Sequence, residues 1–247
     1  MRAVRDRRDD LGMDERRQVM ANAVSYVEGV RDGRPWADMV EVVGPDPVEV
    51  IMSGMRGWAV SAPPELSEEL LARGARLLRH AHVMFFDLKD ADPAEVEAPE
   101  GFRFVPCDRD PEQVFPAVRA AYPPGHPDHR SDRDVERERE ELTKLLEGRL
   151  IGQVLPCSVL VVDADDTVVA GVVVNDMRGQ PWISQVFRHP VSGPRGIGAL
   201  ALRAVQVRAA RDGLAGLGLA VSHTNPARRI YDRLGFVVTE TSMTVVV

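Results

Sequence analysis

Several features are scarce in this chain of 247 residues, and each scarcity argues against a class of protein. Its two cysteines, Cys107 and Cys157, have no closely spaced partners, so neither a disulfide framework nor a zinc knuckle is indicated. No apolar stretch is long enough to span a membrane. The first ten residues are mostly charged and no apolar core follows them, which is unlike a secretory signal. We therefore expect a cytoplasmic protein with no membrane partner.

The net charge of the chain is negative, but the charges are unevenly distributed. The net charge is −7 at pH 7, which argues against a nucleic-acid partner. From Val186 to the C-terminus, however, eight arginines are set against Asp212, Asp232 and Glu240, so this segment is net positive. Solvated helix faces account for some of these arginines, and the others favour a ligand with phosphate groups. The length allows one large domain or two small ones.

The clearest pattern is a predicted strand that leads into a glycine-rich turn and then a helix. The turn contains Gly193, Gly196 and Gly198. Glycine permits positive φ and lets a ligand approach the backbone closely. The first N–H groups of a helix lack partners within the helix and carry partial positive charge, and Arg195 adds a full charge. The segment therefore predicts a phosphate-binding site.

The spacing of these glycines differs from two common nucleotide-binding loops. Gly193-x-x-Gly196-x-Gly198 matches neither G-x-G-x-x-G nor G-x-x-x-x-G-K-[ST]. No lysine follows the last glycine, so chemistry on a nucleoside triphosphate is not expected. Taken alone, the loop is equally compatible with an ordinary strand-to-helix turn.

A second segment predicts a short helix with a tyrosine on its buried face. Asn225 is a favoured N-cap, Pro226 a favoured first helical residue and Gly235 a favoured terminator. Four residues recur with helical spacing: Ala227, Ile230, Tyr231 and Leu234. The phenol is then either an acid beside the bound ligand or a core tyrosine whose hydroxyl finds a local partner.

Together the two segments resemble the GNAT superfamily of acyl-CoA-dependent N-acetyltransferases. The family signature is a strand ending in V-x-V-x-P, then Q/R-x-x-G-x-G/A, and later N-x-x-A-x-x-x-Y-x-x-x-G-F. The chain has Val186-x-Arg188-x-Pro190 followed by the glycine turn at the family's distance. The second block matches in register at Ala227, Tyr231, Gly235 and Phe236.

The chain departs from the signature in two places. Gly193 and Pro194 replace the usual arginine or glutamine and its neighbour, and Pro194 has no N–H to offer a phosphate. Thr224 stands in the asparagine position, with Asn225 one residue nearer the tyrosine. Each departure is expected to weaken cofactor affinity without breaking the loop geometry.

The resemblance covers roughly Phe102 to the C-terminus and implies an α/β fold of the α+β kind. In this GNAT-like fold a mixed, mostly antiparallel central sheet is flanked by helices. The expected order is a strand at 102–105, helices at 111–122 and 134–147, a hairpin at 158–162 and 168–174, a strand at 181–188, the helix after the glycine turn, a strand at 214–222, the tyrosine helix and a final strand from 237. We expect the acetyltransferase domain at 99–247 and an N-terminal accessory segment at 1–98.

The accessory segment is expected to be helical, with one strand. Its predicted elements are helices at 14–30 and 65–78, a strand at 81–88 and a proline-containing linker at 89–101. This order is compatible with an eroded half of a second acetyltransferase-like lobe, although we favour a cap or dimerisation element. An exposed final strand would allow a homodimer. His80 and His82 share one strand face without an evident third ligand, so no metal is expected.

The resemblance also assigns roles to residues. Acetyl-CoA is the implied co-substrate, and the implied acceptor is a primary amine of a small molecule or peptide. Tyr231 would be the catalytic acid that protonates the departing thiolate, while strand N–H groups polarise the thioester carbonyl. The implied coenzyme A-binding residues are Val186, Phe187, Arg188, Gly193, Arg195, Gly196, Ile197, Gly198, Ala199, Asn225 and Tyr231.

The acceptor side and the general base carry no motif. Many family members have a glutamate on the strand before the glycine turn, whereas this strand reads WISQ at 182–185. The candidate acceptor residues are Tyr122, His126, Asp128, His129 and Trp182. The candidate bases are His126, Asp128, His129, His189 and His223. A rigid, proline-rich surface turn is the alternative for the loop that follows Tyr122.

Two other functions stay open on the sequence alone. The missing carboxylate on the strand is compatible with a CoA-binding sensor or regulatory domain that has the fold but little turnover. An unrelated α/β phosphate-binding protein would also have a glycine turn before a helix.

Overall fold

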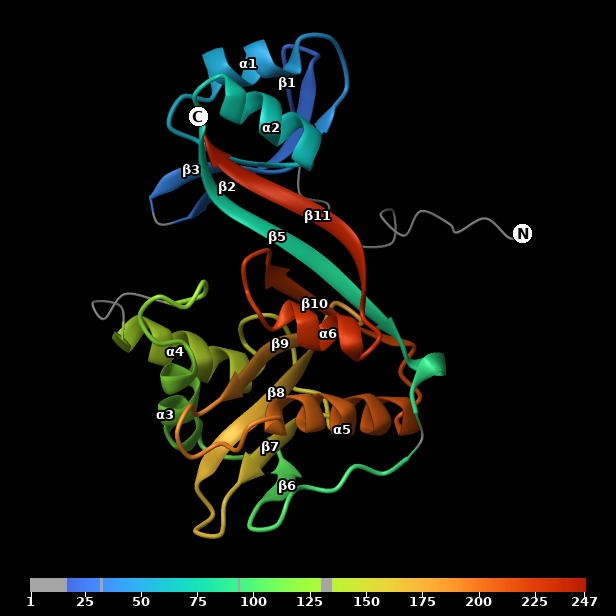
Figure 1. Cartoon of the computed structure of the whole chain (residues 1–247). Coiled ribbons are helices and arrows are strands. Elements are labelled where there is room, and N and C mark those ends of the chain that lie inside the picture. Colours follow the sequence, from blue (N-terminus) through green and yellow to red (C-terminus); the bar gives the residue numbers. More distant parts are fainter. Residues whose placement is uncertain (1–16, 32, 93, 130–134) are drawn as a thin grey trace. The chain divides into compact units, whose positions relative to one another are not determined.

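The computed structural model describes residues 17–31, 33–92, 94–129 and 135–247 (Figure 1). The chain divides into an N-terminal unit, which comprises residues up to 82 together with 240–247, and a C-terminal unit of residues 83–239. The charged residues at the start of the chain lie outside the described residues, as does the beginning of the helix predicted at 14–30. The same holds for residue 134, the predicted start of the second helix.

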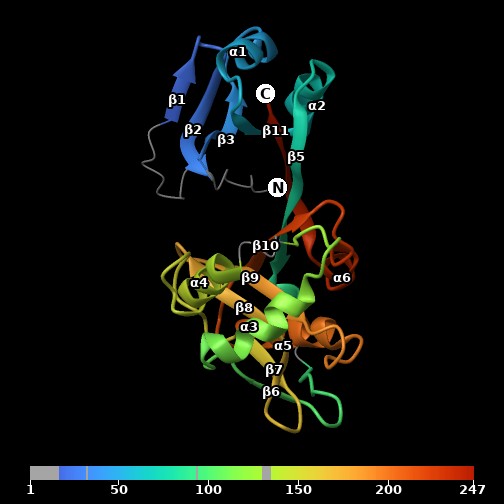
Figure 2. The same cartoon turned by 90° about the vertical axis from the view of Figure 1, so that its left-hand side faces the viewer.

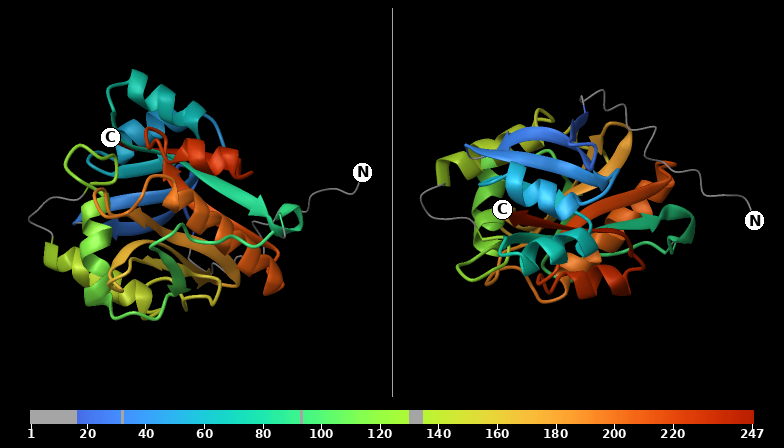
Figure 3. Two further views of the ribbon diagram at one scale, coloured as in Figure 1. Left: turned by 60° about the horizontal axis from the view of Figure 1, so that its bottom comes forward. Right: turned by 90° about the horizontal axis from the view of Figure 1, so that it is seen from above.

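In the N-terminal unit, a small sheet is packed against two short helices, and Figure 3 shows α1 in light blue beside the blue strands. β1, β2 and β3 pair antiparallel, and β3 and β4 pair parallel. The elements are β1 (Arg17–Met20), β2 (Val24–Arg31), β3 (Arg34–Val42), α1 (Pro47–Gly54), β4 (Ala59–Ala62) and α2 (Pro64–Ala72).

This unit shows that the helix predicted at 14–30 is wrong. The described part forms β1 and β2, joined by a turn in which Ala21 and Asn22 have positive φ. Val24 and Tyr26 of β2 are buried in the core of the unit. β-branched and aromatic residues pack well on a pleated, half-buried surface, and this packing overrides the helical pattern of the segment. The helix predicted at 65–78 is correct only as far as Ala72, because Gly74, with φ 101°, ends it.

The boundary between the units lies earlier than the one predicted at 98/99. β5 (Arg76–Asp87) is a single twelve-residue strand that begins in the N-terminal unit and ends in the C-terminal unit. The predicted linker begins with a short 3₁₀ turn, η1 (Leu88–Asp90), and Leu88 is buried in the core of the C-terminal unit. Ala91 and Val96 pack on the same core. The segment is therefore part of that unit's surface layer.

The final strand, β11 (Val237–Val246), also runs from one unit into the other. Its end pairs antiparallel with β4, from Met243 opposite Ala62 to Val246 opposite Ala59. The strand is therefore not the exposed edge on which the homodimer was predicted.

The C-terminal unit contains a mixed, mostly antiparallel sheet between helices, as predicted. Its strands lie in the order β5-β10-β9-β8-β7-β6. β9 and β10 pair parallel, whereas β6 with β7, β7 with β8 and β8 with β9 pair antiparallel. The elements are β6 (Arg103–Pro106), α3 (Pro111–Ala121), α4 (Val135–Leu146), β7 (Val159–Val162), β8 (Val168–Met177), β9 (Gln180–Arg188), α5 (Ile197–Arg211), β10 (Gly216–Ser222) and α6 (Arg228–Arg233).

Helices cover both faces of this sheet (Figure 2). Along β7, Val159 and Val161 point into the core formed with α5, whereas Leu160 and Val162 point into the core formed with α3 and α4. A strand alternates its side chains between two faces, so four successive apolar residues serve two hydrophobic layers. This arrangement fixes β9 and the start of α5, where the phosphate-binding turn was predicted. None of the helices in the described ranges combines the length and apolar character required to cross a bilayer.

Candidate functional site

β9 contains a bulge, beyond which one edge of the strand is free to bind other groups. The pairing of β9 with β8 shifts register between Val173 and Val174, which leaves Ser184 as an extra residue. A bulge bends its strand and increases the local twist. The parallel pairs of β9 with β10 lie before it, at Trp182 with Gly218 and Ile183 with Leu219. Beyond Ser184, the edge of β9 that faces away from β8 is available to other groups.

Tyr122, the residue after α3, forms a hydrogen bond to this edge of β9. Its hydroxyl donates a hydrogen bond to the carbonyl oxygen of Val186 at 2.7 Å and accepts one from Nε2 of Gln185 at 3.3 Å. In an antiparallel strand the N–H and C=O of one residue point to the same side. The N–H of Val186 therefore also points away from β8 and is a suitable donor for a ligand carbonyl. Phe187, in contrast, turns its side chain into the core against Gly171.

Arg188 shapes the loop that follows β9. Its Nη1 donates to the carbonyl oxygens of His189, Pro190 and Gly193, at 3.2, 3.2 and 2.7 Å. A Cβ on Gly193 would lie 2.7 Å from Cγ of Arg188 and 2.8 Å from the carbonyl oxygen of His189, so glycine is required there. The N–H of Gly193 donates to His189 at 3.0 Å. Both residues thus hold the loop in shape, and this N–H is already used within the protein.

The start of α5 presents N–H groups to open space. Gly196 has φ 87° at the N-cap, and a Cβ on Gly196 or Gly198 would meet nothing within 4 Å. The N–H groups of Ile197 and Ala199 donate back to Pro194 at 3.3 Å and to Gly196 at 3.0 Å. Among the described residues, the N–H groups of Arg195 and Gly196 have no protein acceptor. With the charge of Arg195 and no acidic residue in the first turn, this end of α5 suits an anion.

The tyrosine helix begins later than predicted. α6 starts at Arg228, because the N–H groups of Arg228 and Arg229 bond only three residues back, to Asn225 and Pro226. Asn225 still caps this tight first turn, since its Oδ1 accepts from the N–H of Ala227 at 2.8 Å. The prediction of Asn225 as the N-cap is therefore wrong for α6, whose N-cap is Ala227, and Asn225 instead begins the 3₁₀-like turn that precedes the helix.

Tyr231 is on the inward face, as predicted. It is 7% exposed and its ring packs edge-on against Phe236, with centroids 5.9 Å apart. Within the described part of the chain its hydroxyl has no hydrogen-bond partner. Burial, and next the charge of Asp128, raise the pKa of Tyr231 to about 12. The phenol is therefore protonated at neutral pH and can donate a hydrogen bond.

Four of the five predicted acceptor residues lie close together. The ring of Tyr122 meets the ring of His126 edge-on, with centroids 5.0 Å apart. Nδ1 of His126 accepts from the N–H of Asp128 at 3.1 Å, and Nδ1 of His129 lies 2.8 Å from the carbonyl oxygen of Tyr122. Trp182 is the exception, since its ring covers Gly218 of β10.

Asp128 connects this loop to the tyrosine segment. Its Oδ1 accepts from Oγ of Ser222 at 2.8 Å and its Oδ2 accepts from Nδ2 of Asn225 at 2.7 Å. Burial, then Tyr231, then Asp128 raise the pKa of Tyr122 above its usual value. The charge of Asp128 thus acts on both tyrosines. Ser222 carries no sequence signal, and its role depends on a contact between residues 94 positions apart.

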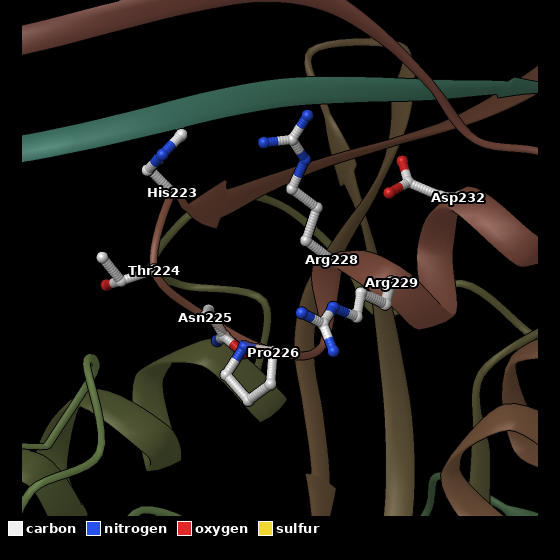
Figure 4. Close-up of a pocket in the computed structure, with 7 residues that line it drawn as sticks. All are labelled: His223, Thr224, Asn225, Pro226, Arg228, Arg229 and Asp232. Carbon is white, nitrogen blue, oxygen red and sulfur yellow. The ribbon is translucent and has the colours of Figure 1, made fainter.

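A basic hollow of about 430 Å³ opens at the start of α6 (Figure 4). Arg228 and Arg229 line it together with a single carboxylate, Asp232. The other lining residues are His223, Thr224, Asn225 and Pro226. Its charge favours an anionic group, as the excess of arginine in this segment predicts.

The acetyltransferase (GNAT) family model matches residues 112–236, from α3 through the glycine turn to the end of the tyrosine segment. The chain belongs to the GNAT family. Its enzyme class is therefore acyltransferase, and the resemblance inferred from the two motifs is confirmed.

Solved structures of GNAT proteins share the fold of this chain. A GCN5-related N-acetyltransferase from Sphaerobacter thermophilus is 23% identical, with a TM-score of 0.62 over 90% of this chain and 76% of that one. One from Kribbella flavida is 18% identical, with a TM-score of 0.57 over 96% and 91% of the two chains. A tandem GNAT protein from the clavulanic acid biosynthesis pathway is 14% identical, with a TM-score of 0.61 over 90% and 78%. No curated protein sequence matches the chain.

Proposed function

We propose that this GNAT protein transfers the acetyl group of acetyl-CoA to a primary amine of a small molecule or peptide, by direct attack of the amine. The observation that carries the proposal is the open edge of β9 beyond Ser184, which leads directly to the unpartnered N–H groups of Arg195 and Gly196. An extended amide-containing arm with a diphosphate at one end matches an edge of this kind.

The residues present fit coenzyme A. Backbone groups of Val186 and Arg188 would hold the pantetheine arm, and the turn from Arg195 to Ala199 would hold the pyrophosphate. Open space at Gly196 and Gly198 supports this assignment, since a ligand can approach the backbone there. Asn225 contributes indirectly, because both ends of its amide are already used. The basic hollow beside α6 adds positive charge near the site.

When bound, acetyl-CoA supplies the thioester that an amine attacks. The N–H of Val186 would donate a hydrogen bond to the carbonyl oxygen as negative charge develops on it. The hydroxyl of Tyr231 would donate its proton to the departing sulfur. Burial raises the pKa of this phenol to about 12, so its proton is present throughout the neutral range.

The proposal is tested by titrating the purified protein with acetyl-CoA and following its melting temperature, with NADH and ATP as controls. A ligand that binds the folded state raises the melting temperature by linkage. We expect a rise specific to acetyl-CoA, followed by release of free thiol when an accepted amine is added. No shift at millimolar acetyl-CoA would overturn the proposal.

A CoA-binding regulatory domain is the second candidate. Residues 182–185 of β9 include no carboxylate, and this favours the second candidate. Stabilisation by acetyl-CoA without thiol release from any amine would select this candidate.

A further inference from the structure

Given the proposed acetyltransfer, we propose that Asp128 is the group that recognises the acceptor, and that the acceptor is a cationic alkylamine. The carboxylate of Asp128 binds the ammonium form and removes its proton. β9 carries neither a glutamate nor an aspartate, so this strand supplies no carboxylate base.

The position of Asp128 is fixed by two elements on the other side of the site. Ser222 at the end of β10 and Asn225 before α6 each donate one hydrogen bond to it, at 2.8 and 2.7 Å. A carboxylate has about four acceptor positions, so these two bonds orient the group and leave others for a ligand. The side chain is 40% exposed, which leaves it accessible.

The same contacts place the carboxylate beside the proposed acid. Asn225 caps the turn that leads into α6, so the segment that holds Asp128 also positions Tyr231. After burial, Asp128 is the cause that raises the pKa of Tyr231, which means that its charge lies within electrostatic range of the phenol. Acyl transfer to an amine needs one group that takes a proton from nitrogen and one that gives a proton to sulfur, and we assign these roles to Asp128 and Tyr231.

Hydrogen bonding disfavours two of the histidines as bases. Nδ1 of His126 accepts from the N–H of Asp128, and Nδ1 of His189 accepts from the N–H of Ser192 at 3.1 Å. A neutral imidazole has a single acceptor nitrogen, so neither ring has a lone pair left for an incoming proton. His129 differs. The carbonyl oxygen of Tyr122 can only accept, so Nδ1 of His129 must carry the proton, and its Nε2 is left as an acceptor. Of the two histidines in the loop that follows Tyr122, His129 is therefore the rival base in the test.

One proton passes from the ammonium group to a carboxylate oxygen of Asp128, which frees the nitrogen lone pair. The lone pair forms the C–N bond at the thioester carbonyl, and the C–S bond breaks. Tyr231 gives its proton to the sulfur and is restored by the second proton lost from nitrogen. Asp128 then releases its proton to solvent, so the net products are an N-acetylated amine, free CoA thiol and one proton.

The decisive variant is Asp128→Asn, with Asp165→Asn as the matched control, because Asp165 is an exposed carboxylate in the turn between β7 and β8. Both are assayed by thiol release with alkylamines, which are cationic at pH 7.5, and with anilines, which are neutral. We expect Asp128→Asn to lower kcat/KM for alkylamines by about 100-fold or more while leaving acetyl-CoA binding intact. Turnover of any aniline that the enzyme accepts should fall much less. Asp165→Asn should match the wild type with both.

Several outcomes would overturn the inference while leaving the acetyltransferase proposal in place. One is unchanged alkylamine turnover in Asp128→Asn; another is a wild-type enzyme that acetylates anilines only. A large loss in His129→Gln combined with activity in Asp128→Asn would make His129 the base. Failure of the wild type to bind acetyl-CoA would instead overturn the proposed function itself.

Ser222 is a positioning residue in this scheme and is tested separately. Ser222→Ala should lower kcat for alkylamines more than it changes KM for acetyl-CoA, and Ser222→Thr should restore activity because it keeps the hydroxyl. Equal loss in both variants would indicate a purely structural role and contradict the orientation of Asp128 by Ser222.

Discussion

At the residue scale, the most testable assignment is the acid. Tyr231→Phe removes one hydroxyl from a side chain that otherwise packs against Phe236. We expect kcat to fall by about 100-fold or more, because general acid catalysis of this kind contributes that much. Affinity for acetyl-CoA should stay close to the wild-type value, since the hydroxyl acts on the departing sulfur. Steady-state kinetics and a calorimetric titration measure the two effects.

Tyr26→Phe is the matched control, because Tyr26 is also a buried tyrosine but belongs to the core of the N-terminal unit. It should leave kcat unchanged. The pKa of Tyr231, about 12, adds a second check, since the wild-type kcat should not decline through loss of the phenol proton below about pH 10. A decline in that range that disappears in Tyr231→Phe would contradict the raised pKa, and an unchanged kcat in Tyr231→Phe would contradict the assignment.

Individual residues also show which features of the site can be predicted from the sequence. Helical spacing places Tyr231 inward because the pattern is local, and the structure confirms it. The hydrogen bonds of Asp128 to Ser222 and Asn225 join residues 94 and 97 positions apart, and no local pattern encodes such a contact. The sequence therefore identifies candidate residues in the acceptor loop, whereas their hydrogen bonds to other elements can be seen only in the folded structure.

At the scale of elements, the structure of the turn between β9 and α5 allows a more specific prediction than the positions of its glycines in the sequence. Gly196 is left-handed but uncrowded, so Gly196→Ala introduces backbone strain without a clash. Strain of this kind costs about 1–2 kcal/mol and shifts the N–H groups of Arg195 and Gly196. We expect the Kd for acetyl-CoA to rise about tenfold, as measured by calorimetry.

Gly213→Ala controls for the strain itself. Gly213 ends the same helix, has φ 75° and is equally uncrowded. Both variants should lower the melting temperature to a similar extent, but only Gly196→Ala should weaken the binding of acetyl-CoA. Equal affinity in the two variants would place the phosphate groups elsewhere.

The elements of the C-terminal unit were predictable because strong local signals bracket each one. Runs of β-branched residues mark β7 and β8, and Asp110 and Pro111 mark the start of α3. The bulge at Ser184 was not predictable, because it depends on the register between two strands. In the N-terminal unit, the helix predicted at 14–30 failed because a short apolar run fits either period and only its partner strands decide.

At the scale of the whole molecule, the two units repeat one order of elements. In the N-terminal unit β2 pairs antiparallel with β3, β3 leads through α1 to the parallel strand β4, and α2 and β5 follow. In the C-terminal unit β8, β9, α5, β10, α6 and β11 repeat this order and these pairings. The tandem GNAT protein shares its fold with 90% of this chain, which is more than the C-terminal unit alone. We propose that the N-terminal unit is an eroded half of a second acetyltransferase-like lobe.

In the N-terminal unit, the turn before α1 corresponds to the turn between β9 and α5. Pro45 and Pro47 have no N–H, Asp46 is the N-cap of α1 and Glu49 lies in its first turn. A Cβ on Gly44 would lie 2.0 Å from the carbonyl oxygen of Asn22, so this glycine serves packing. Negative charge and missing donors make this helix start unfavourable for a phosphate.

We therefore expect one acetyl-CoA bound per chain, measured as the stoichiometry of a calorimetric titration. Arg195→Ala, which removes the cation from the turn before α5, should weaken this single binding event and leave no second one behind. If two molecules bound per chain, or if Arg195→Ala retained one tight site, the N-terminal unit would be a functional lobe and the proposal of erosion would be wrong.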